Sequence, residues 1–534
     1  MTRLKLCSNQ LIFFIAVYIT FVANSVFLLD CVEIVSKQSV ANFPFLISIP
    51  LLLLSLTFLL LRLITPLRIV VKPVLILITV ISALIAAGQS RYGIVFDYGM
   101  VENIFETDVD EASTYLSFGN LGLFLGFVAV PLGLISVTKI KADRVPMELK
   151  RSFILSIMAL ALIGLIASLF YADYAATGRN NRFVKKELVP FQFVSSAIKF
   201  VNHRYLAEPV EFEILDSQPT LMAAANKKPR LNIMVVGETA RAQNFQYQGY
   251  ERPTNQFTKD YSPVYFNNVI SCGTATAVSV PCMFSFQVRD NFDRNKSQNQ
   301  QNVLDIAEKA GVGVTWVDNN SGCKEVCNRV ETIKVSTDEI HPMCDGDYCY
   351  DAVLVEQLHT LLNNSGAQGD SLHDRMVVLH MIGSHGPTYY RRYPATSKYF
   401  TPDCPTNEIQ SCSQDELVNT YDNTILYSDY VNASIIRVLQ EYQNNFDVSM
   451  LYISDHGESL GENGAYLHGF PYMFAPDTQT HVPMLFWSSD NKQMECASRK
   501  SQESLSHDFI SHTLLGLMGI NSTLYNADLD LLQC

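Results

Sequence analysis

Two patterns of apolar residues divide this chain of 534 residues. Five long apolar stretches come first, and each approaches the length of about 20 residues that crosses a bilayer. The first stretch lacks the small-residue cleavage site of a removable signal, so we interpret it as an anchor. Residues 1–172 are therefore predicted to form a transmembrane domain of five helices. The stretches are roughly Leu11–Leu29, Phe45–Leu61, Ile69–Gly88, Gly119–Thr138 and Phe153–Tyr171.

A different pattern follows between residues 173 and 230. Apolar residues recur at helical spacing from Phe191 to Tyr205, with basic residues between them. This pattern predicts an amphipathic helix that either lies on the membrane surface or packs on a folded domain. The stretch from Glu208 to Arg230 contains three prolines and little periodicity, which is typical of a linker.

Short apolar runs of strand length recur in residues 231–534. They alternate with segments long enough for helices, namely Asn302–Ala310, Asp351–Leu362 and Leu417–Tyr442. Strands that alternate with helices predict a mostly parallel sheet with helices on both faces, which is an α/β fold. The predicted strands are Ile233–Val236, Val312–Val317, Met376–Met381, Val448–Ile453 and Val482–Trp487.

Basic residues beside the apolar stretches predict the orientation in the membrane. They gather near the N-terminus and in two connections, whereas the connection from Arg91 to Tyr115 is mostly acidic. Cytoplasmic connections are enriched in Lys and Arg, so the N-terminus is predicted to be cytoplasmic. Five crossings then place residues 231–534 on the outer side. The basic residues are Arg3, Lys5, Arg62, Arg68, Lys72, Lys139, Lys141, Arg144, Lys150 and Arg151.

Net charge and cysteine content narrow the possible partners and compartments. The formal net charge is −13, whereas a nucleic-acid backbone selects basic surfaces, so nucleic acid is not expected as a partner. Ten of the 12 cysteines lie after residue 271. This even number suits disulfides in an oxidising compartment, which agrees with the predicted orientation. Buried free thiols are the alternative.

Candidate chemistry gathers at the ends of three predicted strands. Glu238, His385 and the pair Asp455–His456 each follow an apolar run and stand beside a glycine, which lets the chain turn sharply. Ligands of an open parallel sheet bind at the carboxyl ends of its strands. We therefore expect these four side chains to lie close together.

These residue types suit a zinc ion. Carboxylate and imidazole groups, with a hydroxyl as fourth partner, match the tetrahedral sites that zinc prefers. Zinc lowers the pKa of a bound hydroxyl and so yields a nucleophile near neutral pH. Glu458 and His468 follow His456 within one glycine-rich loop and add two further groups.

Three hydroxyl residues compete for the role of nucleophile. Thr274, Thr276 and Ser279 lie between Cys272 and Cys282 and precede an apolar run. One of them is expected at a helix N-terminus, where free N–H groups favour an anion. The alternative is an N-cap in a turn closed by the two cysteines. The spacing does not choose among the three.

Four runs of the sequence resemble the membrane-bound lipid A phosphoethanolamine transferases, a group that includes the mobile colistin-resistance enzymes. The resemblance covers nearly the whole chain and implies the fold of the alkaline phosphatase and sulfatase superfamily. It also implies a multi-pass protein of the bacterial inner membrane with a periplasmic catalytic domain. The runs are VVGETARAQNFQYQGYERPTNQF, SCGTATAVSVPCMFS, LHMIGSHGP and YISDHGESLGENGAYLHG.

The resemblance also implies roles for single residues. Thr276 looks like the nucleophile, and it resembles a ligand of the catalytic zinc together with Glu238, Asp455 and His456. His385 and His468 look like residues that bind the transferred phosphate or a second zinc, with Glu458 nearby. The substrate contacts implied are Thr274, Asn320 and Lys324 for the head group, and Tyr92, Asn103, Thr107 and Glu111 for lipid.

The implied reaction takes phosphoethanolamine from phosphatidylethanolamine and passes it through Thr276 to a phosphate of lipid A. The added amine would lower the negative charge of the surface and weaken the binding of polymyxins and other cationic peptides. We expect a monomer. Two rival hypotheses remain, a related phosphoglycerol transferase and a non-catalytic binding protein that retains the metal site.

Pairing of near neighbours gives the simplest disulfide scheme, although spacing alone does not determine connectivity. Cys323 and Cys327 could instead bind a metal, but no second cysteine pair has the same spacing. The expected pairs are Cys272–Cys282, Cys323–Cys327, Cys344–Cys349, Cys404–Cys412 and Cys496–Cys534.

Overall fold

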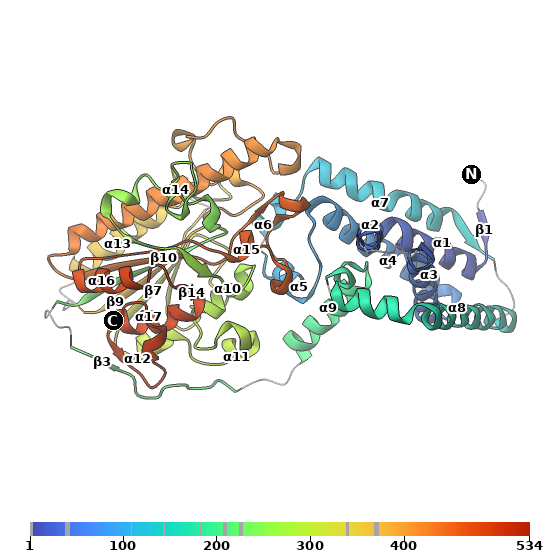
Figure 1. Ribbon diagram of the computed structural model, residues 1–534, viewed down its shortest axis with the longest axis horizontal. Helices are drawn as coiled ribbons and strands as arrows, with labels where there is room; N and C mark the ends of the chain where they lie inside the picture. Colours follow the sequence, from blue (N-terminus) through green and yellow to red (C-terminus); the bar gives the residue numbers. More distant parts are fainter. Residues whose placement is uncertain are drawn as a thin grey trace. The chain divides into compact units, whose positions relative to one another are not determined.

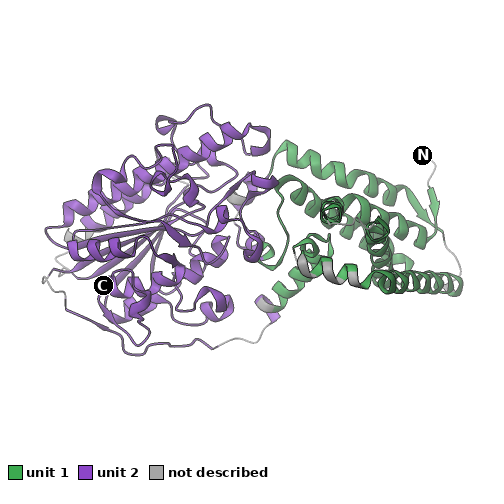
Figure 2. Cartoon of the chain, in the orientation of Figure 1, with its two compact units in different colours: residues 1–101, 116–202 green, residues 102–115, 203–534 purple. Residues whose placement is uncertain are grey.

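The structure is a computed structural model that describes residues 4–37, 43–107, 109–141, 145–181, 183–206, 211–223, 228–337, 341–367 and 373–534. The chain divides into two compact units (Figure 2). The first unit comprises residues 1–101 and 116–202, and the second comprises residues 102–115 and 203–534. A short segment from between two predicted spans therefore belongs to the same unit as the α/β fold.

Long apolar helices form most of the first unit (Figure 1). In the described part of the chain, four helices are long and apolar enough to cross a membrane, and they coincide with four predicted spans. Shorter elements complete the unit, including α5 (Tyr98–Glu106), which continues into the second unit, and the strand pair β1 (Leu4–Leu6) and β2 (Thr138–Ile140). The four helices are α3 (Phe43–Ile64), α4 (Arg68–Tyr92), α7 (Phe118–Val137) and Pro146–Tyr171 within α8 (Val145–Asn180).

The first predicted span is bent. Helix α1 (Ser8–Tyr18) continues as a π-helical turn to Ala23, and α2 (Ser25–Ser36) leaves at an angle of 58°. Asn24 lies at the bend, where its buried amide donates hydrogen bonds to the carbonyls of Ile19 (2.8 Å) and Val189 (2.7 Å). The amide thereby competes with the helical ladder, which explains the bend that hydropathy alone did not predict.

The amphipathic pattern does form a helix. Helix α9 spans Phe191–Val201 and continues as a π-helical turn to Leu206. Within the predicted linker, residues 208–210 and 224–227 lie outside the described residues. Thr220–Leu221 within it forms a short strand, β3, against β15 (Ile520–Asn521).

A mostly parallel sheet is the centre of the second unit. Among the described residues it has seven strands in the order β5-β13-β10-β4-β9-β7-β8, and only β13 runs against its neighbours. Two short edge strands were not predicted, β5 (Val264–Phe266) and β8 (Glu331–Lys334). The five predicted strands are present as β4 (Arg230–Gly237), β7 (Gly313–Asp318), β9 (Arg375–His380), β10 (Asp447–Ser454) and β13 (Met484–Ser488).

Both faces of the sheet are buried, so its central strands are mostly apolar. Along β4, Met234 and Val236 pack with one core cluster, whereas Ile233 and Val235 pack with the other. Helices α13 (Ala352–Ala367) and α14 (Gln414–Tyr442) cover one face. The other face carries α10 (Thr276–Met283), α12 (Val303–Ala310) and α17 (Ile510–Met518), as Figure 1 shows. The architecture predicted from the alternating pattern is confirmed.

All ten cysteines of the second unit form disulfides. The pairs are the five expected from sequence neighbours, and Cys323 and Cys327 are therefore not metal ligands. Cys7 and Cys31 in the first unit are free.

Candidate active site

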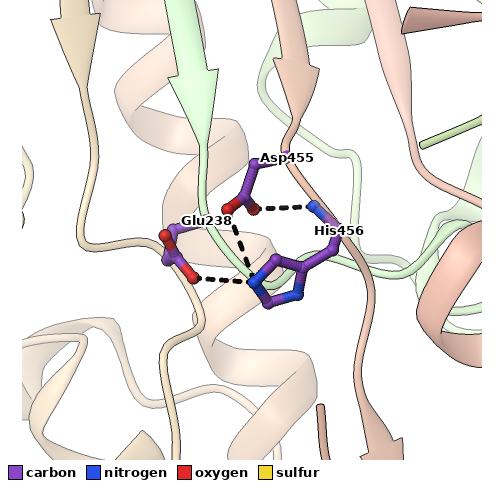
Figure 3. Close-up of side chains that lie close together, drawn as sticks. All are labelled: Glu238, Asp455 and His456. Carbon is purple, nitrogen blue, oxygen red and sulfur yellow. Dashed lines mark hydrogen bonds and ion pairs between the residues drawn. The ribbon is translucent and has the colours of Figure 1, made fainter. Parts of the chain in front are cut away.

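Two neighbouring parallel strands bring three polar residues together (Figure 3). Gly237 at the end of β4 pairs with Ser454 at the end of β10, so the residues that follow leave the sheet side by side. One ligand atom each from Glu238, Asp455 and His456 lies within 4.8 Å of the others, and all three side chains are buried. His456 Nε2 lies 3.3 Å from Glu238 Oε1 and 3.4 Å from Asp455 Oδ2.

Burial and mutual charge shift the pKa values of these three groups. Burial alone would raise the pKa of Glu238, but the hydrogen bond and charge of His456 lower it well below its usual range. Burial and the negative charge of Glu238 raise the pKa of Asp455 to about 6. Burial disfavours a charged His456, yet Asp455 and Glu238 raise its pKa to about 10. Two buried carboxylates share one imidazole, so the cluster favours additional positive charge.

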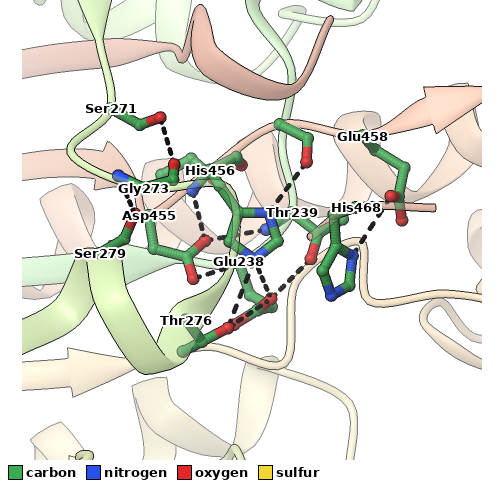
Figure 4. Close-up of polar contacts among 12 residues, drawn as sticks. Glu238, Thr239, Ser271, Gly273, Thr276, Ser279, Asp455, His456, Glu458 and His468 are labelled. Carbon is green, nitrogen blue, oxygen red and sulfur yellow. Dashed lines mark hydrogen bonds and ion pairs between the residues drawn. The ribbon is translucent and has the colours of Figure 1, made fainter. Parts of the chain in front are cut away.

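The Thr276 hydroxyl points into this cluster (Figure 4). Thr276 is the first residue of α10, and its Oγ1 donates to Glu238 at 3.2 Å (Oε1) and 3.1 Å (Oε2). The same oxygen lies 3.4 Å from His456 Nε2. The side chain is buried, which keeps bulk water from the hydroxyl.

The other two candidate nucleophiles bond to the backbone. The hydroxyl of Thr274 donates to the carbonyl of Phe470 at 2.6 Å. The hydroxyl of Ser279 accepts from the N–H of Gly273 at 2.9 Å. Both bonds fix the loop before α10, so Thr276 is the one of the three that faces the carboxylates.

Close backbone packing holds the loops around the site. A β-carbon on Gly457 would lie 2.1 Å from the carbonyl oxygen of Thr478, so only glycine fits there. Thr239 adopts a φ of 58°, which is uncommon for a threonine. Its N–H and that of His456 donate to Asp455 Oδ1 at 3.1 Å and 2.7 Å.

A second group of polar residues borders the first. The imidazole of His468 lies beside that of His456, with ring centroids 4.4 Å apart, and the ring of His385 lies 5.6 Å from that of His468. Glu458 accepts a hydrogen bond from Tyr389 at 2.9 Å, and its other oxygen lies 3.3 Å from His468 Nδ1. Glu458 thus bonds the outer histidine and makes no contact of hydrogen-bond length with the first group.

Asn320 and Lys324, two of the three predicted head-group residues, make different contacts. Asn320 follows β7, and its amide donates to Glu238 Oε2 at 2.8 Å and to the carbonyl of Met381 at 2.9 Å. The Lys324 ammonium donates to the Ser321 hydroxyl at 3.0 Å and lies 3.4 Å from the carbonyl of Glu106. Asn320 is therefore part of the site, and Lys324 links it to the segment of residues 102–115.

The predicted lipid contacts are divided between the two units. Tyr92, at the end of α4, accepts a hydrogen bond from Asn120 at 2.7 Å within the first unit. Asn103 and Thr107 belong to the second unit, where the Thr107 hydroxyl donates to the carbonyl of Asn103 at 2.8 Å. Glu111 lies in α6 (Val109–Thr114), and its side chain is outside the described residues.

The pair Asp318–His380 also borders the site. Asp318 lies at the end of β7, and its carboxylate lies 3.5 Å from His380 Nδ1 and accepts from the N–H of Asn320 at 2.7 Å. Asp318 was not among the candidate residues predicted from the sequence. Its position at a strand end, beside Asn319 and Asn320, was the available signal. Asp318 and His380 both contact Asn320, whose amide donates to Glu238.

The three-residue cluster fits a divalent metal ion. Two carboxylates and an imidazole, with a hydroxyl beside them, form the oxygen and nitrogen donor set that zinc binds. Asp455 Oδ2 is buried and accepts no hydrogen bond from the residues that the structure describes, although such an oxygen normally has a partner. A cation at this point would satisfy that oxygen and offset the negative charge.

The sheet and its site define the class of protein. Residues 230–520 match the family model of the sulfatases, so this region is a sulfatase-type domain of the alkaline phosphatase superfamily. This match agrees with the mostly parallel sheet and with a polar cluster at the ends of its central strands.

The particular family follows from the whole chain. Residues 53–205 match the model described as phosphoethanolamine transferase EptA/EptB. The chain is 44% identical over 453 residues to phosphoethanolamine transferase EptA of Escherichia coli strain K12, covering 83% of this chain and 81% of that protein. It therefore belongs to the phosphoethanolamine transferases and is an enzyme of that family.

Two further similarities agree with this assignment. Phosphatidylethanolamine transferase Mcr-1 of Escherichia coli is 35% identical over 455 residues, covering 83% of each chain. Among solved structures, the integral membrane protein lipooligosaccharide phosphoethanolamine transferase A (EptA) from Neisseria meningitidis matches with a TM-score of 0.92 and 36% identity over 99% of both chains. The long apolar helices and the α/β domain thus both have counterparts in a membrane protein.

Proposed function

We propose that this enzyme transfers phosphoethanolamine from phosphatidylethanolamine to lipid A, with Thr276 as the nucleophile and zinc as the cofactor. The observation that carries the proposal is the Thr276 hydroxyl, which lies within 3.2 Å of both oxygens of Glu238 beside a cluster that fits a metal. The names of the relatives support the donor, the transferred group and a lipooligosaccharide acceptor. They favour phosphoethanolamine over the phosphoglycerol of the rival hypothesis.

The reaction consists of two transfers at Thr276. In the first, Oγ1 attacks the phosphorus of the donor, the bond from phosphorus to the diacylglycerol oxygen breaks, and the hydroxyl proton ends on diacylglycerol. In the second, a phosphate oxygen of lipid A attacks the same phosphorus. The bond to Thr276 breaks, and the acceptor's proton restores the hydroxyl.

The residues that would hold zinc are Glu238, Thr276, Asp455 and His456. When bound, zinc lowers the pKa of a hydroxyl and offsets charge on a phosphoryl oxygen. Glu238 orients the hydroxyl through the bonds described above, and Asn320 and Thr239 hold Glu238 in turn. The buried position of Thr276 limits hydrolysis of the phosphoethanolamine that it carries.

The outer polar residues would bind the substrates. His468 lies next to His456, and His385 lies next to His468. Both histidines would contact the transferred phosphate or hold a second zinc, and Glu458 would orient His468. The remaining proposed contacts are Thr274, Asn320 and Lys324 for the head group, and Tyr92, Asn103, Thr107 and Glu111 for lipid.

The proposed location follows from the charge pattern and from the acceptor. Residues 1–172 would span the bacterial inner membrane with a cytoplasmic N-terminus, residues 173–230 would form the surface helix and linker, and residues 231–534 would lie in the periplasm. The protein would act as a monomer. Added phosphoethanolamine would make cells resistant to polymyxins, because these cationic peptides bind a less negative surface more weakly.

The covalent intermediate provides the test. The full-length enzyme is incubated in detergent with phosphatidylethanolamine and no acceptor, then digested and analysed by mass spectrometry. We expect one phosphoethanolamine group on the peptide that contains Thr276, none in Thr276→Ala or after chelation of zinc, and an unchanged adduct in Ser279→Ala. An adduct on Thr274 or Ser279 would overturn the assigned nucleophile. A phosphoglycerol adduct formed from phosphatidylglycerol would instead support the rival reaction.

A further inference from the structure

Helix α10, which begins with Thr276, contains a proline at a position that removes a backbone bond. The carbonyl of Ala277 would normally accept from the N–H four residues later, but that residue is Pro281 and has no N–H. Ala277 directly follows the proposed nucleophile and is buried. A buried carbonyl without a partner is costly, so another donor is expected at this position.

Arg294 supplies that donor. It is the first residue of α11 (Arg294–Gln298), and its Nη1 donates to the carbonyl of Ala277 at 2.6 Å. The α10–α11 contact is reinforced by the Ser297 hydroxyl, which lies 3.4 Å from the carbonyl of Pro281. The guanidinium thus replaces the helical bond that Pro281 removes.

Two carboxylates also contact the same guanidinium. Nη2 of Arg294 lies 2.8 Å from Glu106, and Nη1 lies 3.5 Å from Glu102. The side chains of Arg294 and Glu102 are only 10% and 9% exposed, so solvent screens these contacts little. Burial raises the pKa of Glu102 even though Arg294 opposes the rise. Glu102 and Glu106 begin the segment of residues 102–115, which lies in the second unit.

We propose that Arg294 is a positioning residue that holds the first turn of α10, and hence the Thr276 hydroxyl, against the segment of residues 102–115. The inference rests on the proposed function, because it assumes that Thr276 is the nucleophile. The same segment carries Asn103 and Thr107, two of the proposed lipid contacts. Arg294 therefore couples the segment that would bind the donor lipid to the group that would attack it.

Transfer kinetics of the full-length enzyme with phosphatidylethanolamine test the proposal. In Arg294→Gln we expect kcat to fall by about tenfold to a hundredfold, the loss typical of a displaced reacting group, with KM within about twofold of wild type. Glu106→Gln should lower kcat by a smaller factor. Arg329→Gln is the matched control, since it breaks the ion pair of Arg329 with Asp305 elsewhere in the unit and should leave kcat unchanged.

A double variant separates positioning from general stability. Pro281→Ala restores a backbone N–H that can donate to the carbonyl of Ala277. The double variant Arg294→Gln/Pro281→Ala should therefore recover at least part of the kcat lost in Arg294→Gln. If Arg294→Gln does not fold, Arg294→Lys, which keeps the charge but offers a single donor group, takes its place under the same criterion. Wild-type kcat in the Arg294 variant, or a loss that Pro281→Ala does not relieve, would overturn the inference. An inactive wild type would instead contradict the proposed function.

Discussion

The hydroxyl of Thr276, the carboxylates of Glu238 and Asp455 and the imidazole of His456 come from three separate stretches of sequence. Two of these stretches meet because β4 and β10 are paired neighbours in the sheet. The third joins them because α10 packs on one face of that sheet. Each side chain is buried, so its chemistry depends on its neighbours more than on solvent. Changes of one residue are therefore expected to have large effects here.

Gly457 is a sensitive position of this kind. In Gly457→Ala the new β-carbon would collide with the carbonyl of Thr478, so the loop that carries His456 and Glu458 must move. We expect a loss of about 1–3 kcal/mol in stability, as for other overpacked sites, and a fall in transfer activity of at least tenfold. Thermal unfolding in detergent and the transfer assay measure the two effects.

A glycine in the same loop serves as the control. Gly464 has a φ of 78° and open space around it, and asparagine tolerates that conformation. Gly464→Asn should leave activity within about twofold of wild type. Equal activities of the two variants would show that close packing at Gly457 does not position the site.

Asp318 gives a prediction about pH. Burial alone would raise the pKa of Asp318, but the charge of His380 and hydrogen bonds lower it from 3.8 to about 2. A carboxylate with a lowered pKa stabilises the fold above its unfolded pKa, and this contribution disappears as the pH falls from about 4 to about 2. This lowering of the Asp318 pKa corresponds to about 2 kcal/mol of folding stability at neutral pH.

The melting temperature as a function of pH checks this contribution. Asp318→Asn should melt at a lower temperature than wild type at pH 7, and the gap should narrow as the pH falls toward 3. Asp290→Asn, at an exposed carboxylate, should follow wild type at every pH. A constant gap for Asp318→Asn would contradict the stabilising role of the ionised pair.

At the scale of elements, regular patterns were predictable and local geometry was not. The strands β4, β9 and β10 and the residues that follow them could be read from apolar runs that end in glycine and polar groups. The edge strands β5 and β8, with three and four residues, carry too short a pattern, and their position depends on pairing with distant strands. The bend at Asn24 was missed because it comes from a side-chain bond that hydropathy does not register.

The choice of Thr276 over Thr274 and Ser279 shows the same limit. The sequence predicted that one of the three lies at a helix N-terminus without choosing which, and in the structure the three hydroxyls differ in the contacts that they make. The hydroxyls of Thr274 and Ser279 bond to the backbone of Phe470 and Gly273, and these contacts exist only in the folded chain. Family resemblance supplied the choice that spacing did not.

The disulfide Cys272–Cys282 constrains helix α10 and the loop before it. It joins residues 10 apart, and closing such a loop contributes about 3 kcal/mol in the chain-entropy model. In the double variant Cys272→Ser/Cys282→Ser we expect a lower melting temperature and a fall in transfer activity, because the first turn of α10 loses one of its restraints.

Loss of a disulfide elsewhere separates stability from activity. Cys404–Cys412 joins residues 8 apart, and this loop contains none of the candidate site residues. Cys404→Ser/Cys412→Ser should lower the melting temperature by a similar amount with a smaller effect on transfer. If both double variants lose activity equally, the first disulfide has no special role at the nucleophile.

At the scale of the whole molecule, the division into two units does not follow the order of the sequence. Residues 102–115 come from between two predicted spans but belong to the unit with the α/β fold. Hydropathy predicted the spans on either side, and charge marked the segment as acidic. Its membership in the second unit depends on tertiary contacts such as those of Glu106 with Arg294, which no local pattern predicts.

The most direct measurement is the mass of lipid A from cells that express the full-length chain. Cells that express the wild-type chain should contain lipid A heavier by one phosphoethanolamine group. Cells that express the Thr276→Ala variant at the same level in the membrane should contain only unmodified lipid A. Modified lipid A in the Thr276→Ala cells, or unmodified lipid A in the wild type, would contradict the account.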